Sequence, residues 1–318
     1  MKPQVLVLAP FLEQTLEPLH ARFELIDIGA DPRAGLAARA GEPPVRAALT
    51  IGNAPLDAEM VAQMPGLEFV CHYGAGYDQI DLAALERAGV AFANTPGANT
   101  ACVADLALAL HLTLVRQVVI TDRGVRDGEW QRQGNRFGFG RGMAGRRVGI
   151  LGLGAIGEAI ARRAEAFGME IGYHNRRPRA DIRYRHFDSL TGLAGWADDL
   201  VIAAAASAAN RGIVDAAVLR ALGAGGYVIN IARGSLIDEA ALLEALREGR
   251  IAGAGLDVHA SEPDTNPAFH DMPNVILTPH MAGKTDRALA DTDEMFRSNL
   301  AGFFEDVTPH SGDAGLGG

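Results

Sequence analysis

The stretch that decides the fold runs Arg147-Val148-Gly149-Ile150-Leu151-Gly152-Leu153-Gly154-Ala155-Ile156-Gly157. An apolar strand is followed here by the pattern G-x-G-x-x-G, which opens a segment with helical spacing. The first glycine permits a tight turn, the second lets a pyrophosphate approach the backbone, and the third lets helix and strand pack closely. The helix N-terminus adds free N–H groups for the diphosphate. The alternative is a glycine-rich turn without a ligand. We expect a dinucleotide to bind at Gly152, Leu153, Gly154, Ala155, Ile156 and Gly157.

Strands and helices keep alternating after this unit, which predicts a parallel, doubly wound sheet. The strands are apolar and nearly unbroken, as expected for a sheet that is buried on both faces. The expected strands are 147–151, 169–173, 200–204, 226–231, 251–255 and 275–278, and the expected helices are 155–167, 239–248 and 284 to about 306.

The first hundred residues predict a second α/β unit, because short apolar runs alternate there with segments of helical spacing. Asp81 stands where a helix N-cap is expected. Residues 29–44 are rich in glycine, alanine and proline and predict a surface connection with at most a short helix. The expected strands are 5–9, 23–28, 45–51, 67–71 and 90–92, and the expected helices are 56–64 and 81–87.

The segment from residue 100 to about 127 contains no proline, and no glycine before Gly124. Its alanine, leucine and valine content predicts a single long helix that joins two domains. Residues 128–145 then carry Trp130, Phe137 and Phe139 among glycines and arginines. A loop of that size in a compact domain is usually functional or covered by a partner subunit.

Composition and charge exclude several classes of protein. A chain of 318 residues that is 48% hydrophobic can bury a large core, and we expect two domains. The net charge of −10 argues against a nucleic acid partner. Cys71 and Cys102 lack the spacing of a zinc site or a disulfide framework, so no metal is expected. No apolar run forms a signal peptide or reaches the roughly 18 residues of a membrane span, which predicts a cytoplasmic protein without a membrane partner.

The residues after the second strand of the cofactor unit bear on the choice of dinucleotide. An NAD site expects Asp or Glu there, to accept a hydrogen bond from the ribose 2′-hydroxyl. This chain instead carries Asn175, Arg176 and Arg177. Guanidinium groups would hold a 2′-phosphate that a carboxylate would repel, so we predict NADP, with NADPH preferred over NADH. The alternative is that these arginines lie in a solvated turn.

Three polar segments follow strands of the predicted sheet, at the carboxyl ends where ligands bind. They carry Arg233, Glu262 and His280. Reducing a keto acid requires a hydride donor, a proton donor and a cation for the carboxylate. Histidine is the natural acid near neutral pH, a neighbouring carboxylate favours its charged form, and arginine binds carboxylate and carbonyl oxygens. We predict His280 as the acid/base, Glu262 as its partner and Arg233 as the substrate cation.

Taken singly, each of these residues also has an ordinary structural explanation. Arg233 could form a salt bridge at the sheet edge, Glu262 could be a turn residue before proline, and His280 could be a polar residue at a helix start.

Four motifs together carry a resemblance to a known family. G-L-G-A-I-G, N-I-A-R-G-S-L-I-D, G-L-D-V-H-A-S-E-P and T-P-H-M-A-G follow one another in the order and spacing of the D-isomer-specific 2-hydroxyacid dehydrogenases. The likeness begins near Leu67 and extends over most of the chain. Within the family, the arginine-rich cofactor end resembles the NADPH-dependent glyoxylate/hydroxypyruvate reductases.

The resemblance implies further site residues. The loop of Tyr73, Gly74, Ala75 and Gly76 would offer backbone N–H groups to the substrate carboxylate, as a nest-type anion site. One departure is the absence of the proline that the family usually carries near Ala205, which could loosen the adenosine side. The remaining cofactor contacts would come from Ala205, Ala206, Ile231, Ala232, Arg233, Asp257, His280 and Gly283.

The resemblance also implies an architecture of two Rossmann-like domains with a cleft between them. Residues 1–99 plus 286–318 would form the substrate domain and residues 100–285 the NADP-binding domain. The relatives are dimers through an arm, which corresponds here to about 116–145. Trp130, Phe137 and Phe139 would be its buried anchors, with ordinary core packing as the alternative.

The reaction that the resemblance favours is reduction of hydroxypyruvate or glyoxylate to the D-2-hydroxy acid by hydride transfer from NADPH. Two alternatives stay open: a dehydrogenase of a small anion such as formate or phosphite, and an NAD(P)-binding sensor of the corepressor type.

Overall fold

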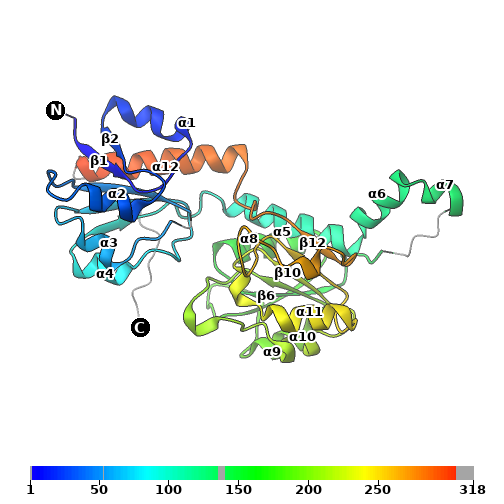
Figure 1. Cartoon of the computed structure of the whole chain (residues 1–318). Helices are drawn as coiled ribbons and strands as arrows, with labels where there is room; N and C mark the ends of the chain where they lie inside the picture. Colours follow the sequence, from blue (N-terminus) through cyan, green and yellow to red (C-terminus); the bar gives the residue numbers. More distant parts are fainter. Residues whose placement is uncertain (1, 53, 135–139, 306–318) are drawn as a thin grey trace. The chain divides into compact units, whose positions relative to one another are not determined.

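The computed structural model describes residues 2–52, 54–134 and 140–305. These residues form two parallel sheets of five and seven strands, each in its own compact unit (Figure 1). The described residues of Met1–Asn99 and Thr285–Gly318 make up one unit, and those of Thr100–Lys284 the other. The predicted fold class, α/β with parallel doubly wound sheets, is confirmed. Phe137 and Phe139 lie outside the described residues.

The first unit is a five-stranded sheet with the order β2-β1-β3-β4-β5. Side chains alternate between its two faces, as strand geometry requires. Leu6 belongs to the core cluster shared with α2, α3 and α4, whereas Val5 and Val7 belong to the cluster that includes Phe296 of α12. The elements are β1 Gln4–Val7, α1 Glu13–Leu16, η1 Glu17–Ala21, β2 Glu24–Asp27, α2 Pro32–Ala38, β3 Ala47–Ile51, α3 Ala58–Ala62, β4 Phe69–Tyr73, α4 Leu82–Arg87, β5 Ala91–Ala93 and α12 Asp286–Phe304.

The second unit is a seven-stranded sheet with the order β12-β11-β10-β9-β6-β7-β8. Helices α5 and α8 cover one face, and α9, α10 and α11 cover the other. The elements are α5 Thr100–Val115, α6 Val118–Arg126, α7 Glu129–Gln133, β6 Arg147–Leu151, α8 Ala155–Ala166, β7 Glu170–His174, β8 Arg185–His186, α9 Leu190–Trp196, β9 Asp199–Ile202, η2 Ala208–Asn210, α10 Ala216–Leu222, β10 Tyr227–Asn230, η3 Gly234–Leu236, α11 Glu239–Arg247, β11 Gly253–Leu256, η4 Pro267–Phe269 and β12 Val275–Leu277.

The prediction of one helix from residue 100 to about 127 was wrong. Gln117 adopts a left-handed conformation with φ of 55°, which ends α5, and α6 starts in a new direction, bent by 61°. A left-handed residue other than glycine is uncommon, so the sequence carries no signal for this break. The segment that was expected to be a loop also contains a short helix, α7. Figure 1 shows α6 and α7 extending beyond α5, away from the seven-stranded sheet.

Within the described residues, no single helix is long and apolar enough to cross a membrane. Only α5 and α6 taken together reach that composition, across their bend, and much of α5 is buried in the core of its unit.

Candidate active site

The glycine loop follows β6 in the interior of the seven-stranded sheet. Strand order reverses at β6, because β7 and β8 continue on one side and β9 to β12 on the other. Such a switch point is where ligands bind in open α/β sheets. A Cβ at Gly152 would lie 2.5 Å from the Ala204 backbone, and one at Gly157 would lie 2.2 Å from the Gly152 carbonyl oxygen. A Cβ at Gly154 would meet nothing within 4 Å, so this glycine faces open space.

The first turn of α8 meets the requirements of a phosphate site. Its N-cap is Gly154, which has no side chain to occupy the first amides of the helix. Behind the loop, Asn175 Oδ1 accepts a hydrogen bond from the Leu153 amide at 2.7 Å, and Arg179 Nη1 donates to the Leu153 carbonyl at 3.1 Å. Arg179 also pairs with Glu158 of α8 at 3.1 Å. These residues fit a dinucleotide, whose diphosphate the loop would hold.

The basic run lies directly after β7. Asn175 is beside the glycine loop, where its side-chain oxygen braces Leu153, and Arg176 and Arg177 follow as exposed residues. Arg179 was not among the predicted cofactor residues, yet its guanidinium donates to the Leu153 carbonyl of the loop. Its place in the same basic run was the only signal for it in the sequence.

Arg233 sits in a turn that two other residues define. Asn230, fully buried at the end of β10, accepts a hydrogen bond from the Ala232 amide at 3.0 Å and donates to the Arg233 carbonyl at 2.9 Å. A Cβ at Gly234 would lie 2.0 Å from the carbonyl carbon of His259. Gly234 thus lets the turn after β10 lie directly against the loop after β11. Neither Asn230 nor Gly234 was singled out in the sequence, although both stand next to Arg233.

Glu262 and His280 form a hydrogen-bonded pair. Glu262 Oε2 lies 2.7 Å from His280 Nδ1, and Oε1 accepts from the His259 amide at 3.0 Å. Burial raises the pKa of Glu262, but the hydrogen bonds from His280 and the His259 amide outweigh it and bring that pKa below its usual value. Glu262 is therefore a carboxylate anion. The Nδ1–H of His280 is held by Glu262, which leaves Nε2 as the nitrogen that can meet a ligand.

Asp257 holds the loop that carries His280. Its buried carboxylate accepts hydrogen bonds from Thr278 Oγ1 at 2.6 Å and from the amides of Met281 and Ala282 at 2.9 Å each, and its carbonyl accepts from the His280 amide at 2.8 Å. These bonds stabilise the left-handed conformation of His280, whose φ is 49°. The geometry thus gives Asp257 a positioning role, whereas the resemblance implied a contact with the cofactor.

The other residues predicted for the cofactor lie at the same edge of the sheet or in the loops that follow it. Ile231 and Ala232 are buried after β10, Gly283 is half-buried after β12, and the loop after β9 carries Ala205 and Ala206. The Ala205 carbonyl accepts a hydrogen bond from Asn210 Nδ2 at 2.9 Å.

The predicted substrate loop follows β4 in the first unit. Tyr73 is the last residue of that strand, and its hydroxyl donates to Asp293 of α12 at 2.9 Å. The Tyr73 side chain is therefore part of the core contact with α12. Gly74, Ala75 and Gly76 follow as a half-buried loop.

Taken together, the seven-stranded unit offers three chemical groups at the ends of adjacent strands. A carboxylate–imidazole pair with a half-exposed ring can exchange a proton with a ligand, and a guanidinium on the neighbouring turn can bind an anion. The glycine loop at the centre of the same sheet edge can bind a diphosphate.

Comparison with known proteins gives a consistent result. Residues 108–282, more than half of the chain, match the family model described as D-isomer specific 2-hydroxyacid dehydrogenase, NAD binding domain. The glyoxylate/hydroxypyruvate reductase A of Arabidopsis thaliana is 39% identical over 290 residues, which cover 90% of this chain and 92% of that protein. The 2-ketogluconate reductase of Gluconobacter oxydans is 37% identical over 308 residues, covering 96% and 97%.

Solved structures support the same family assignment. A 2-hydroxyacid dehydrogenase from Ketogulonicigenium vulgare Y25 superposes with a TM-score of 0.90 at 37% identity, covering 98% of both chains. An NADPH-dependent glyoxylate/hydroxypyruvate reductase from Sinorhizobium meliloti, in complex with NADP and malonate, gives 0.86 at 36% identity, covering 96% of this chain and 94% of that one. This chain therefore belongs to the D-isomer-specific 2-hydroxyacid dehydrogenase family and is an enzyme that uses a nicotinamide dinucleotide to interconvert 2-keto and 2-hydroxy acids.

Proposed function

We propose that the enzyme reduces a small 2-keto acid to the D-2-hydroxy acid, with hydroxypyruvate or glyoxylate as the preferred substrate and NADPH as the reductant. The observation that carries this proposal is the Glu262–His280 pair, held at 2.7 Å beside the turn of Arg233. The names of the relatives from Arabidopsis thaliana and Sinorhizobium meliloti support this choice of substrate.

Each residue of the proposed site has a separate role in the reaction. NADPH, when bound, supplies the hydride that is added to the carbonyl carbon. His280 donates a proton from Nε2 to the carbonyl oxygen, so that the developing alkoxide is neutralised as it forms. Glu262 orients the imidazole through Nδ1 and stabilises its positive charge before the transfer. Arg233 binds the substrate carboxylate and polarises the ketone. The loop after β4 binds the carboxylate through the backbone amides of Ala75 and Gly76, since the Gly74 amide already donates to Thr95 Oγ1 at 3.1 Å.

The preference for NADPH is the part of the proposal that rests on Arg176 and Arg177. Both are exposed in the turn after β7, next to Asn175, which braces the glycine loop. A 2′-phosphate on the adenosine ribose would carry negative charge into this turn, and guanidinium groups bind phosphate in pairs of parallel hydrogen bonds.

The direct test measures initial rates of NADPH and NADH oxidation with hydroxypyruvate, glyoxylate, pyruvate and phenylpyruvate. We expect turnover with NADPH, and a loss in kcat of about a hundredfold or more in His280→Ala. His270→Ala is the matched control, since this histidine is exposed and, among the described residues, its side chain has a polar contact only with the Thr265 hydroxyl. Absence of turnover with every keto acid would reject the reductase proposal, and oxidation of formate or phosphite, or NADPH binding without any turnover, would then identify which alternative holds.

The cofactor preference has its own test. Arg176→Ala and Arg177→Ala should each raise the KM for NADPH by about tenfold and leave the KM for NADH unchanged. Arg220→Ala, which removes an exposed arginine of α10, should change neither constant. Equal effects on both cofactors would reject a role in recognising the 2′-phosphate.

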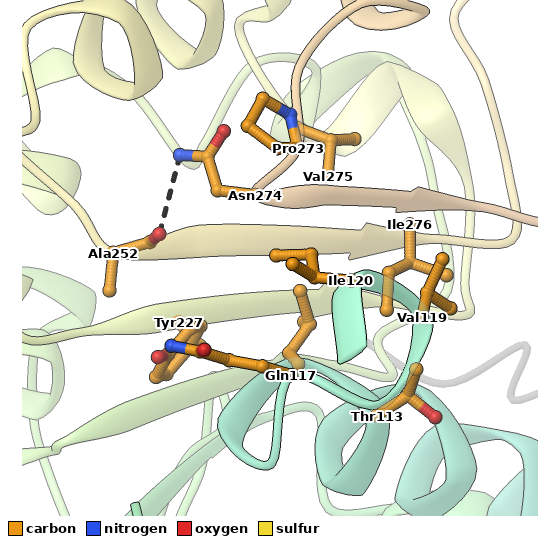
Figure 2. A pocket seen from close by; sticks show the side chains of 11 residues that line it. Thr113, Gln117, Val119, Ile120, Tyr227, Ala252, Pro273, Asn274, Val275 and Ile276 are labelled. Carbon is orange, nitrogen blue, oxygen red and sulfur yellow. Dashed lines mark hydrogen bonds between the residues drawn. The ribbon is translucent and has the colours of Figure 1, made fainter. Parts of the chain in front are cut away.

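We further propose that the enzyme is a homodimer in which a second copy covers α6 and α7. Val118, Val119, Ile120, Val125 and Trp130 on these helices are between 42% and 53% exposed. The exposure of Trp130 argues against ordinary core packing within the chain. Figure 2 shows the hollow where Val119 and Ile120 meet the edge of the sheet near Asn274, whose side chain donates to the Ala252 carbonyl at 3.3 Å. Exposed apolar surface of this kind marks an interface between proteins.

Sedimentation equilibrium tests the dimer. Ile120→Asp should shift the wild-type dimer to a monomer, because it introduces a charge into the apolar face. Leu12→Asp is the matched control, since Leu12 is 59% exposed but lies outside α6 and α7. A wild-type monomer, or equal effects of the two variants, would reject the interface.

A further inference from the structure

The loop after β4 is held through three of its own consecutive carbonyl groups, each of which forms a hydrogen bond with a neighbouring residue. The Gly74 carbonyl accepts a hydrogen bond from the Thr95 amide at 3.1 Å, and the Ala75 carbonyl accepts from Asn94 Nδ2 at 2.9 Å. The third, that of Gly76, lies 2.8 Å from His72 Nε2. Three successive peptide planes are thus fixed from the ends of β4 and β5.

Fixing these carbonyls also fixes the amides that follow them. A peptide group is planar and trans, so the N–H of each residue points away from the carbonyl before it. The N–H groups of Ala75, Gly76 and Tyr77 therefore point away from the groups that hold the loop. No described residue accepts a hydrogen bond from any of these three amides. A row of such amides is a binding site for an anion.

His72 is built to act as a single donor. Its side chain is fully buried on β4, and burial lowers its pKa to about 4, so the imidazole is neutral near pH 7. A neutral imidazole carries one N–H, and the Gly76 carbonyl can only accept, so the proton must be on Nε2. Nδ1 is buried without a hydrogen-bond partner in the described part of the chain. Among the described residues, the hydrogen-bond contact of the ring is therefore with the loop alone.

We infer that His72 is a positioning residue of the substrate site, whose Nε2–H sets the peptide plane between Gly76 and Tyr77 and so directs the Tyr77 amide toward the substrate carboxylate, beside the amides of Ala75 and Gly76 that Thr95 and Asn94 orient. This inference rests on the proposed function, because that proposal assigns the carboxylate to this loop. His72 touches neither substrate nor cofactor in this assignment and acts only through the backbone of the loop.

Thr50 offers a matched control for a merely structural role. It lies opposite His72 in the register of β3 and β4, it is equally buried, and its hydroxyl has no hydrogen-bond partner in the described part of the chain. Thr50→Val removes a buried polar atom from the neighbouring strand without breaking a bond to the loop. His72→Phe keeps an aromatic ring but removes the donor, and His72→Gln restores an N–H near the position of Nε2.

The test compares steady-state kinetics of the three variants and wild type with hydroxypyruvate and NADPH. His72→Phe should raise the KM for the keto acid by about tenfold, lower kcat by less than about threefold and leave the KM for NADPH unchanged, as expected when one hydrogen bond that orders a binding loop is lost. His72→Gln should recover most of the KM, and Thr50→Val should match wild type. A crystal structure of His72→Phe should show the Gly76 carbonyl turned from its present direction.

Each other result overturns the inference in a distinct way. An unchanged KM in His72→Phe, with wild-type turnover intact, would overturn the role of His72 and leave the proposed function standing. An equal rise in Thr50→Val would show that the strand ends had merely loosened. Absence of keto acid turnover in wild type would reject the proposed function, and the inference with it. An unmoved Gly76 carbonyl in the variant structure would show that Thr95 and Asn94 hold the loop without His72.

Discussion

Glu262 Oε2 and His280 Nδ1 lie 2.7 Å apart, although 18 residues separate them along the chain. Sheet order explains the contact. Strands β11 and β12 are parallel neighbours, so the loops that leave their carboxyl ends start from the same edge. Asp257, directly after β11, then ties the amides of Met281 and Ala282 to its own carboxylate. The carboxylate–imidazole pair is a consequence of strand adjacency and of this anchor.

Replacing the Glu262 carboxylate by an amide should remove the charge but keep the shape. Glu262→Gln should lower kcat for keto acid reduction by about a hundredfold, because the imidazolium loses the anion that orients and stabilises it. Steady-state kinetics would measure this, with an unchanged KM for NADPH expected. Glu239→Gln is the control, since Glu239 is a carboxylate of the same unit that accepts from Asn266 at 2.7 Å. A kcat like that of wild type in Glu262→Gln would show that the pair has no catalytic role.

The close contact at Gly234 predicts that adding a single methyl group to this residue destabilises the protein. Gly234→Ala would place a Cβ 2.0 Å from the backbone of His259, where no flexible side chain can give way. The two loops must then separate, which should destabilise the protein by about 1–3 kcal/mol and displace Arg233. Thermal unfolding would measure the loss of stability, and the KM for the keto acid would measure the displacement of Arg233. Gly195→Ala, at a site in α9 with nothing within 4 Å, should be neutral or stabilising; equal losses in both variants would contradict the prediction.

Substitutions at two glycines of the glycine loop should affect different properties: Gly157→Ala the stability of the protein, and Gly154→Ala the binding of the dinucleotide. Gly157→Ala would put a Cβ 2.2 Å from the Gly152 carbonyl oxygen and should lower thermal stability. Gly154→Ala has open space and a φ of −86°, so its unfolding temperature should equal that of wild type. Its Cβ would nevertheless occupy the place of a diphosphate, and the Kd for NADPH should rise by about tenfold or more. Fluorescence titration would measure the Kd. An unchanged Kd for NADPH in Gly154→Ala would show that the diphosphate does not bind at this glycine.

His72 predicts a pH dependence of stability. Its pKa falls from 6.5 to about 4 on folding because of burial, a shift that the hydrogen bond to the Gly76 carbonyl and the nearby charge of Asp78 oppose. The unfolded chain therefore binds the extra proton between these values, and the free energy of unfolding should fall as pH drops from about 6.5 to 4. The full contribution is about 3 kcal/mol. Urea unfolding across this range should show a smaller decline for His72→Gln than for wild type, and parallel declines would contradict the assignment.

Local patterns allowed a large part of the fold to be predicted. The strand expected at 147–151 is β6, with the same bounds, and the helix expected at 155–167 is α8, Ala155–Ala166. Both signals lie within one short window, where glycine spacing and apolar periodicity leave few alternatives. The long helix was wrong because its break depends on a left-handed Gln117. Helix α9, which begins at Leu190, was also not predicted, since its glycines at 192 and 195 weaken the helical pattern.

The sequence by itself determined the class of chemistry: the glycine loop, the basic run after it, and Arg233, Glu262 and His280 after three strands. These are local patterns, because one strand end and one turn suffice to display each of them. The tertiary structure alone decided which groups meet. That Gly234 lies against His259, that Asp257 anchors the His280 loop, and that His72 bonds to the Gly76 carbonyl all depend on strand order and packing distance. Contacts between distant segments follow from how the sheet assembles, and no window of sequence contains that information.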